Sequence, residues 1–166
     1  MPRVTERERI GVLFVCLGNI CRSPLAEGLF VHKALEHGQA GRFYVDSAGT
    51  GQWHVGEGVD QRMIDIAKKK GVKLISRARQ ITSDDFTRFR HIICMDHSVL
   101  TRVLKLGAPP DRTRLLLRKK SRSKTPAAGE DVPDPYLGGK EEFEAVYGIV
   151  DHACDVLLDE LLNSKA

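Results

Sequence analysis

The chain has 166 residues, of which 42% are hydrophobic and 29% are charged. This length and balance predict one soluble, globular domain rather than a disordered chain. The net charge of +4 does not by itself argue for nucleic-acid binding, and no apolar run approaches the ~18 residues of a membrane helix. Four cysteines are too few for a disulfide scaffold, so we expect a protein of the reducing cytoplasm.

The first nine residues mix acids and bases and contain no apolar stretch. They do not resemble a signal peptide, although secretion by another route stays open. We expect residues 1–9 to form a mobile extension and residues 10–166 to form a single domain, because no repeat or long linker divides them.

Apolar runs alternate with amphipathic stretches along the chain. Buried strands are predicted at Ile10–Val15, Phe43–Ser47, His91–Met95 and Arg114–Leu117. Helices are predicted from Pro24 towards Gly38, around Met63–Ala67, from about Ser98 to Leu106, and along an apolar stripe from Phe143 to Leu161. This alternation predicts an α/β fold with a parallel sheet. Ligands of such sheets bind beyond the carboxyl ends of the strands, where Cys16 follows the first strand.

The segment Cys16-Leu-Gly-Asn-Ile-Cys-Arg-Ser23 joins the first strand to the first helix. Backbone N–H groups in such a turn and the positive end of the helix attract an anion. We expect Gly18 to allow a positive φ and a close backbone approach, and Asn19 to tolerate left-handed geometry. Arg22 offers a planar set of donors that suits phosphate oxygens. The segment therefore predicts an oxyanion site.

A thiol at the base of this loop experiences the same electrostatic field as the anion, which favours the thiolate of Cys16. A thiolate beneath a bound phosphate is a nucleophile for phosphorus, and Ser23 is placed to donate a hydrogen bond to it. A single cysteine after a strand is more often a small core residue. The combination of Cys16, Gly18, Asn19, Arg22 and Ser23 is much more specific and favours catalysis.

The loop resembles the signature of the low-molecular-weight protein tyrosine phosphatases. Four later segments resemble that family in the same order: Asp46–Ala48, Ala78–Thr82, Ile93–Asp96 and Asp134–Tyr136. The resemblance implies a four-stranded parallel sheet in the order 2-1-3-4 with helices on both faces. It also implies hydrolysis of phosphotyrosine through a phosphocysteine on Cys16, without a metal or another cofactor. The residues expected to hold the phosphate are Leu17, Gly18, Asn19, Ile20, Cys21, Arg22 and Ser23.

Release of tyrosine requires a proton, because the phenol has a pKa of ~10. The segment "VPDPYLGG" places Asp134 between two prolines, a pattern that is most often only a surface turn. The resemblance makes Asp134 the general acid, and later the base that activates water. To act as an acid it must hold its proton near neutral pH, which a neighbouring phosphate dianion favours.

Two aromatic residues are candidates for the walls of the site. Trp53 lies in a glycine-rich loop that is ill suited to bury it, and Tyr136 follows the candidate acid. Each is compatible with a simple surface aromatic, but the resemblance makes them opposite walls of a deep slot. Such a slot favours phosphotyrosine over the shorter phosphoserine.

Two serines are expected to support the loop. Ser76 stands where relatives often have a histidine that steadies the loop asparagine, and the resemblance implies that Ser47 helps to maintain this network through its hydroxyl. Asp96 and Arg79 are further candidate supports.

Cys21 is open to two interpretations. It either fills space behind the loop or protects the nucleophile by capturing oxidised Cys16 as a disulfide. In the low-molecular-weight phosphatases that this loop resembles, oxidation to such a disulfide inactivates the enzyme reversibly.

Seven basic residues and no acid lie between Arg112 and Lys124. Such a run is usually a solvated segment, and it also suits acidic phosphoproteins. It lacks the interleaved aromatics of a nucleic-acid site, and the six histidines show no metal-ligand spacing with the cysteines. The expected partner is a tyrosine-phosphorylated protein, with no nucleic acid and no membrane span, and we expect a monomer or weak dimer.

Three other functions remain possible from the sequence. An arsenate reductase needs further accessible cysteines, whereas Cys94 and Cys154 lie in a predicted buried strand and on an apolar helix stripe. Protein-arginine phosphatases resemble this chain but tend to have threonine at the position of Ile20. A non-catalytic phosphoprotein-binding module would be expected to lack Cys16 or Asp134, and both are present.

Overall fold

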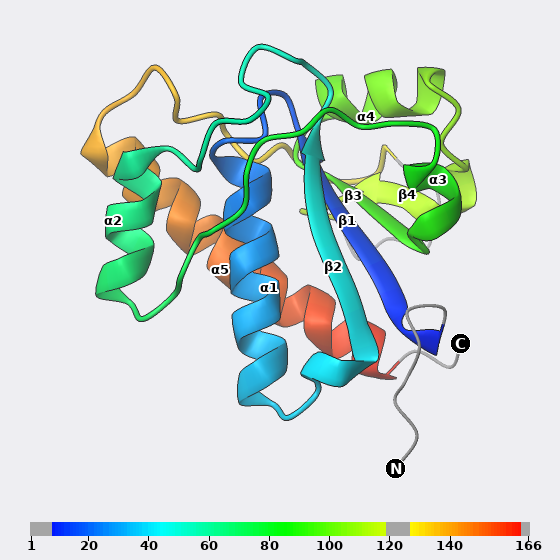
Figure 1. Cartoon of the computed structure of the whole chain (residues 1–166), viewed down its shortest axis with the longest axis horizontal. Coiled ribbons are helices and arrows are strands. Elements are labelled where there is room, and N and C mark those ends of the chain that lie inside the picture. The colour runs from blue at the N-terminus through cyan, green and yellow to red at the C-terminus, as the bar shows by residue number, and fades with distance from the viewer. Residues whose placement is uncertain (1–7, 119–126, 164–166) are drawn as a thin grey trace.

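The computed structural model describes residues 8–118 and 127–163 and is built around one parallel sheet (Figure 1). Its four strands follow the order β2-β1-β3-β4, as expected. The strands are β1 (Ile10–Cys16), β2 (Phe43–Gly49), β3 (His91–Cys94) and β4 (Thr113–Leu115). Every pair is parallel, so all four carboxyl ends meet at one edge of the sheet.

Strand β1 occupies the middle of the sheet because its apolar side chains can be buried on both faces. It pairs with β2 along its whole length, from Ile10 opposite Phe43 to Cys16 opposite Gly49. On its other side it pairs with β3. This pairing fixes Cys16 at the carboxyl edge of the sheet.

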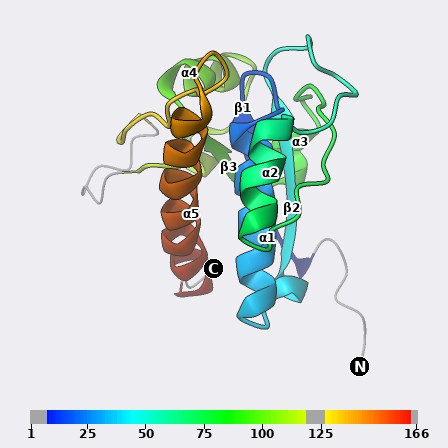
Figure 2. The same ribbon diagram turned by 90° about the vertical axis from the view of Figure 1, so that its left-hand side faces the viewer.

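Helices cover both faces of the sheet (Figures 1 and 2), which confirms that prediction. One face carries α1 (Arg22–Glu36), α2 (Gln61–Lys69) and α5 (Lys140–Asn163), and the other carries α3 (Asp85–Arg88) and α4 (His97–Lys105). Helix α5 packs against both α1 and α2, and Figure 2 shows it beside them. In the described parts of the chain, no helix combines the length and the apolar character needed to cross a membrane.

The last strand is shorter than the prediction of Arg114–Leu117. The chain turns at Leu116, and Leu117 forms an isolated bridge with Glu130 instead of extending β4. Helix α3 and two 3₁₀ turns, Ala40–Arg42 and Pro110–Arg112, were not predicted, because they are too short to show an apolar period. The expected mobile extension and the basic run lie largely outside the described residues, so neither prediction is tested.

Gly49 ends β2 directly beside the loop that follows β1. A Cβ at this position would lie 2.8 Å from the carbonyl oxygen of Leu17 and 3.1 Å from the Cβ of Asn19. No side chain fits there without moving the loop. The glycine therefore allows the end of β2 to support the candidate site.

Phe30 is expected to be a main contributor to stability. Its ring is fully buried between Phe14 and Phe43, with ring centroids 5.8 and 5.0 Å away. We expect Phe30→Ala to lower the free energy of unfolding by about 3–5 kcal/mol in denaturant titrations, because it leaves a cavity. Leu35→Ala on the same helix, where the side chain is 65% exposed, should change it by less than about 0.5 kcal/mol. Equal effects of the two substitutions would contradict this account of the core.

Candidate active site

The loop between β1 and α1 is held in its conformation by Asn19. Asn19 has a φ of 57°, and no other non-glycine residue among those described has a positive φ. Gly18 does not use the freedom to adopt a positive φ that its residue type allows. It does allow a close approach, because a Cβ there would lie 3.0 Å from the ring of His54, a tight contact.

The thiol of Cys16 lies at the base of this loop and is almost completely buried. The backbone N–H of Asn19 donates to its Sγ across 3.2 Å. The Oγ of Ser23, in the first turn of α1, lies 2.9 Å from the same sulfur. A thiolate at this position accepts both hydrogen bonds, since it carries no proton of its own.

The direction of the surrounding hydrogen bonds follows from the side-chain amide of Asn19. The backbone N–H of Arg79 donates to Oδ1 of Asn19 across 2.9 Å, which assigns the amide orientation. The Nδ2 group then donates to Ser23 at 2.9 Å and to Ser47 at 3.0 Å. Because Ser23 accepts from Asn19, its own proton is available to the sulfur of Cys16. Ser47 and Arg79 therefore fix the side chain of Asn19, and through it the loop.

The hydroxyl of Ser47 in turn donates to Oε1 of Glu27 across 2.6 Å. Sequence reasoning missed Glu27, because one acid on a helix carries no signal of its own. Ser76 forms its hydrogen bond with Glu27 and not with Asn19. It is therefore connected to Asn19 through Glu27 and Ser47. Burial raises the pKa of Glu27 from 4.5 to about 7, and the negative charge of Asp46 raises it as well. The hydrogen bonds from Ser47 and Ser76 act in the opposite direction but are outweighed.

Arg22 is 3% exposed and is held by groups from two segments, one after β3 and one after β4. Its Nη1 donates to Oδ2 of Asp96 at 2.7 Å and to the carbonyl of Val132 at 2.9 Å. Its Nη2 lies 3.6 Å from Oδ2 of Asp134. Burial opposes the charge, but the neighbouring Cys16 and Asp96 prevail and raise the pKa of Arg22. Asp96 accepts from Arg22 and also caps α4 by accepting from the N–H of Val99.

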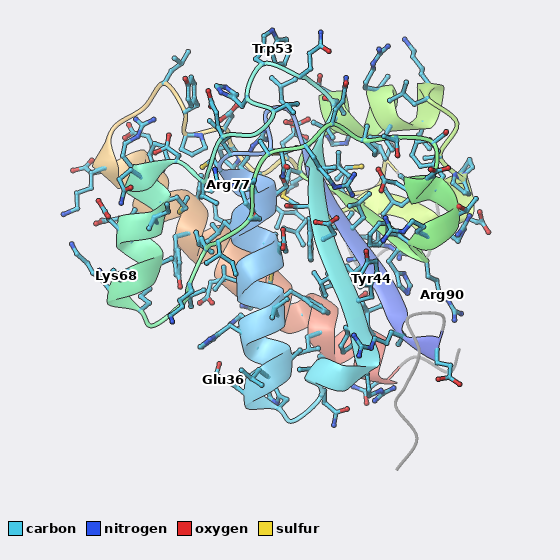
Figure 3. All side chains as sticks on the ribbon, in the orientation of Figure 1. Glu36, Tyr44, Trp53, Lys68, Arg77 and Arg90 are labelled. Atoms are coloured by element: carbon cyan, nitrogen blue, oxygen red, sulfur yellow. The ribbon has the colours of Figure 1, made fainter. Side chains whose placement is uncertain are left out.

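A cavity of about 250 Å³ lies above Cys16. The predicted aromatic residues line it and are well exposed, Trp53 at 70% and Tyr136 at 43% (Figure 3 shows Trp53 above the carboxyl ends of the strands). His54, which sequence reasoning missed, also lines it, with its ring centroid 5.8 Å from that of Tyr136. The full lining is Cys16, Leu17, Gly18, Asn19, Ile20, Cys21, Arg22, Trp53, His54, Asp134 and Tyr136.

The remaining thiols are buried and free. Burial raises the pKa of Cys21, Cys94 and Cys154, although Cys21 alone of the three lines the cavity. Within residues 8–118 and 127–163, no group of three or more His, Cys, Asp or Glu side chains is placed to hold a metal ion.

The fold and this arrangement define a class. A thiol at the carboxyl end of a central parallel strand receives a backbone and a hydroxyl donor, next to a buried arginine and an exposed aspartate. This is the arrangement of a cysteine-based phosphatase, in which a thiolate faces a bound phosphate.

Comparison with known proteins identifies the family. The family model for low molecular weight phosphotyrosine protein phosphatase matches residues 11–166. A relative from Schizosaccharomyces pombe with that name is 40% identical over 141 residues, which cover 84% of this chain and 89% of the relative. A low molecular weight protein-tyrosine-phosphatase from Streptomyces coelicolor is 40% identical over 149 residues, covering 89% and 90%. The crystal structure of YfkJ from Bacillus subtilis matches with a TM-score of 0.83 and 34% identity, covering 95% of this chain and 98% of that one. The chain belongs to the low molecular weight phosphotyrosine protein phosphatase family.

Glu27 should make stability depend on pH. Because its folded pKa of about 7 lies above 4.5, the folded state binds the extra proton, and the free energy of unfolding falls as pH rises between these values. The loss is on the order of 3 kcal/mol. We expect Glu27→Gln to remove this part of the pH dependence between pH 5 and 8 in denaturant titrations, while the exposed Glu36→Gln on the same helix retains it. Parallel curves for wild type and Glu27→Gln would contradict the assignment.

Proposed function

We propose that this protein hydrolyses phosphotyrosine in proteins, with Cys16 as the nucleophile and Asp134 as general acid and base. The observation that carries the proposal is the hydrogen bonding of the Cys16 sulfur by Asn19 and Ser23 at the base of the cavity. Family membership supports the same reaction. The phosphate is proposed to bind over the loop, against Arg22 and the loop residues from Leu17 to Ser23.

In the first step the Cys16 thiolate attacks phosphorus, and an S–P bond forms as the bond from phosphorus to the tyrosyl oxygen breaks. Asp134 gives its proton to that oxygen, so that neutral tyrosine leaves. The guanidinium of Arg22 faces the phosphoryl oxygens, where charge develops. The place of Asp134 in the lining of the cavity, together with Cys16, supports this role.

In the second step water attacks the phosphocysteine. The Asp134 carboxylate takes a proton from that water, a P–O bond forms, and the P–S bond breaks to release inorganic phosphate and the thiolate. The hydroxyl of Ser23 stabilises the departing thiolate, because Asn19 leaves the Ser23 proton free to point at sulfur. The cycle needs no cofactor.

Trp53 and Tyr136 are proposed as the walls that select phosphotyrosine. Both border the cavity whose floor is Cys16. A phosphate on a long aromatic side chain reaches that floor while its ring contacts the walls. A phosphoserine side chain is shorter, and its backbone would meet the walls before its phosphate met the sulfur.

Arsenate reduction is disfavoured by the thiols. Cys94 and Cys154 have no exposed surface and do not line the cavity with Cys16, so neither is placed to relay a disulfide. The phosphoarginine alternative depends on Ile20, which is buried and lines the cavity. The residue at this position supports phosphotyrosine, and the experiment below separates the two substrates.

We also infer the setting in which the protein acts. A nucleophilic thiolate suits the reducing cytoplasm, and the expected partner is a tyrosine-phosphorylated protein rather than nucleic acid. A single domain over residues 10–166 and a monomeric or weakly dimeric state remain predictions, which proteolysis and sedimentation can test.

The proposal is tested by phosphate release from matched peptides that carry phosphotyrosine, phosphoserine or phosphoarginine, without added metal. We expect turnover of phosphotyrosine, lowered by at least roughly 10⁴-fold in Cys16→Ser because the nucleophile is lost. Leu35→Ala, which alters an exposed side chain far from the loop, serves as the control. Preference for phosphoarginine would retain the mechanism but overturn the proposed specificity, and no turnover of any peptide would contradict the phosphatase assignment.

Cys21 is proposed to protect the nucleophile. Peroxide converts the Cys16 thiolate to a sulfenic acid, and the Cys21 thiol then forms a disulfide with it and releases water. We expect dithiothreitol to restore activity to peroxide-treated wild type but to restore less of it to Cys21→Ser, whose sulfenic acid is oxidised further. Each variant is measured against its own untreated activity. Equal recovery would leave Cys21 as a space-filling residue.

A further inference from the structure

Arg62 contacts the segment that carries the proposed acid. This residue lies in the first turn of α2, and its Nη2 donates to the carbonyl of Tyr136 at 3.0 Å. Its Nη1 donates to the carbonyl of Gly138 at 3.1 Å. One guanidinium thus holds two carbonyl groups just after Asp134, although it is 74 residues away in sequence from Tyr136.

The same guanidinium is connected to the catalytic loop through Asp60. Its Nε and Nη2 donate to the two carboxylate oxygens of Asp60 at 3.1 and 2.9 Å. These hydrogen bonds lower the pKa of Asp60, so its charge persists at working pH. The backbone N–H of Asp60 donates to the carbonyl of Ile20 at 2.7 Å. A continuous chain of hydrogen bonds therefore connects Ile20, through Asp60 and Arg62, to residues 134–138 (the acid segment).

The guanidinium of Arg62 stacks on an aromatic ring. The Cζ atom of Arg62 lies 4.1 Å from the ring centroid of Phe143, which is fully buried in α5. It also lies 5.9 Å from the ring of Tyr136. Arginine suits this place because its planar group stacks on a ring while its edge donates to several acceptors at once, which an ammonium group does not.

Asp134 itself has few contacts that could fix its position. Its side chain is 45% exposed; Oδ1 accepts from the N–H of Tyr136 at 3.1 Å within the same segment, and Oδ2 lies 3.6 Å from Arg22. Before Asp134 the backbone is anchored at Val132, through Arg22 and through Met95. After Asp134 it is anchored by Arg62. The proposed acid therefore sits between two anchors, and Arg62, unlike Arg22, lies outside the cavity lining.

We propose that Arg62 is a positioning residue that holds Asp134 in place to protonate the leaving oxygen. The proposal rests on the proposed function, because it assumes that Asp134 is the acid. It assigns Arg62 no contact with substrate. Its action is to set the distance between the acid segment and the catalytic loop through Asp60.

The leaving group provides a readout that a purely structural role would not change. Phenol is a weak acid and needs a proton as it leaves, whereas 4-nitrophenol is a much stronger acid and leaves readily as an anion. Both substrates present one ring to the same walls, so altered packing of Tyr136 affects them alike. The value of kcat/KM covers the step in which the phenol leaves.

We expect Arg62→Ala to lower kcat/KM for phenyl phosphate by roughly 10–100-fold and for 4-nitrophenyl phosphate by less than about 3-fold, since general acids contribute about 10²–10⁴-fold. Arg62→Lys should show the same selective loss, because it retains the charge but not the fork of donors. Arg77→Ala is the matched control. Arg77, labelled in Figure 3, donates to the carbonyl of Gly56 and not to the acid segment, so the ratio of the two substrates should stay at the wild-type value.

Asp134→Ala supplies the reference for complete loss of the acid. If Arg62 acts through Asp134, adding Arg62→Ala to Asp134→Ala should cause little further loss with phenyl phosphate. Equal losses on both substrates, or additive losses in the double variant, would overturn the proposal. Thermal unfolding checks each variant, and Arg62→Lys carries the test if Arg62→Ala does not fold. A wild type without activity, or an Asp134→Ala variant without leaving-group dependence, would instead contradict the proposed function.

Discussion

The side-chain amide of Asn19 determines the direction of the hydrogen bonds on which the site depends. Its left-handed backbone turns the loop so that its own N–H points at the Cys16 sulfur. Its oxygen is occupied by the backbone of Arg79, which leaves its NH₂ group to donate to two serines. Since a hydroxyl that accepts at one side donates at the other, the proton of Ser23 is left for the thiolate. An isosteric aspartate would offer no such donors, and the order of these bonds would be lost.

Arg22 adds a second constraint, because a buried guanidinium is costly unless it is paired. The side chain satisfies this requirement by binding the carboxylate of Asp96 and the carbonyl of Val132, from segments that follow β3 and β4. The cation that we propose to face the phosphate therefore also connects three parts of the chain, namely α1 and the segments after β3 and β4. Its geometry is preorganised before substrate arrives, which is the condition under which electrostatic stabilisation is most effective.

Much of this was accessible from the sequence, because the chemistry is concentrated in short segments. The loop from Cys16 to Ser23 carries its own pattern, and the apolar runs predicted the four strands and the helices α1, α2, α4 and α5 to within a few residues. The residues that were missed act over long sequence distances. Glu27, His54 and Arg62 are ordinary polar residues of a helix or loop, and only the fold shows that they meet Ser47, Gly18 and Tyr136. The close contact between Gly18 and the ring of His54 was likewise not visible in the local pattern, because the two residues are far apart in the sequence.

The parallel sheet also places the start of β1 and the end of α5 at the opposite end of the domain from the cavity. Strand β1 starts at Ile10 and carries the chain towards Cys16, while α5 runs back along α1 to finish at Asn163 near the start of that strand (Figure 1). The cavity opens at the other end of the sheet. A protein or surface tethered close to Ile10 or Asn163 would therefore leave the entrance of the cavity free. The geometry is compatible with activity of the domain while it is attached to such a protein or surface.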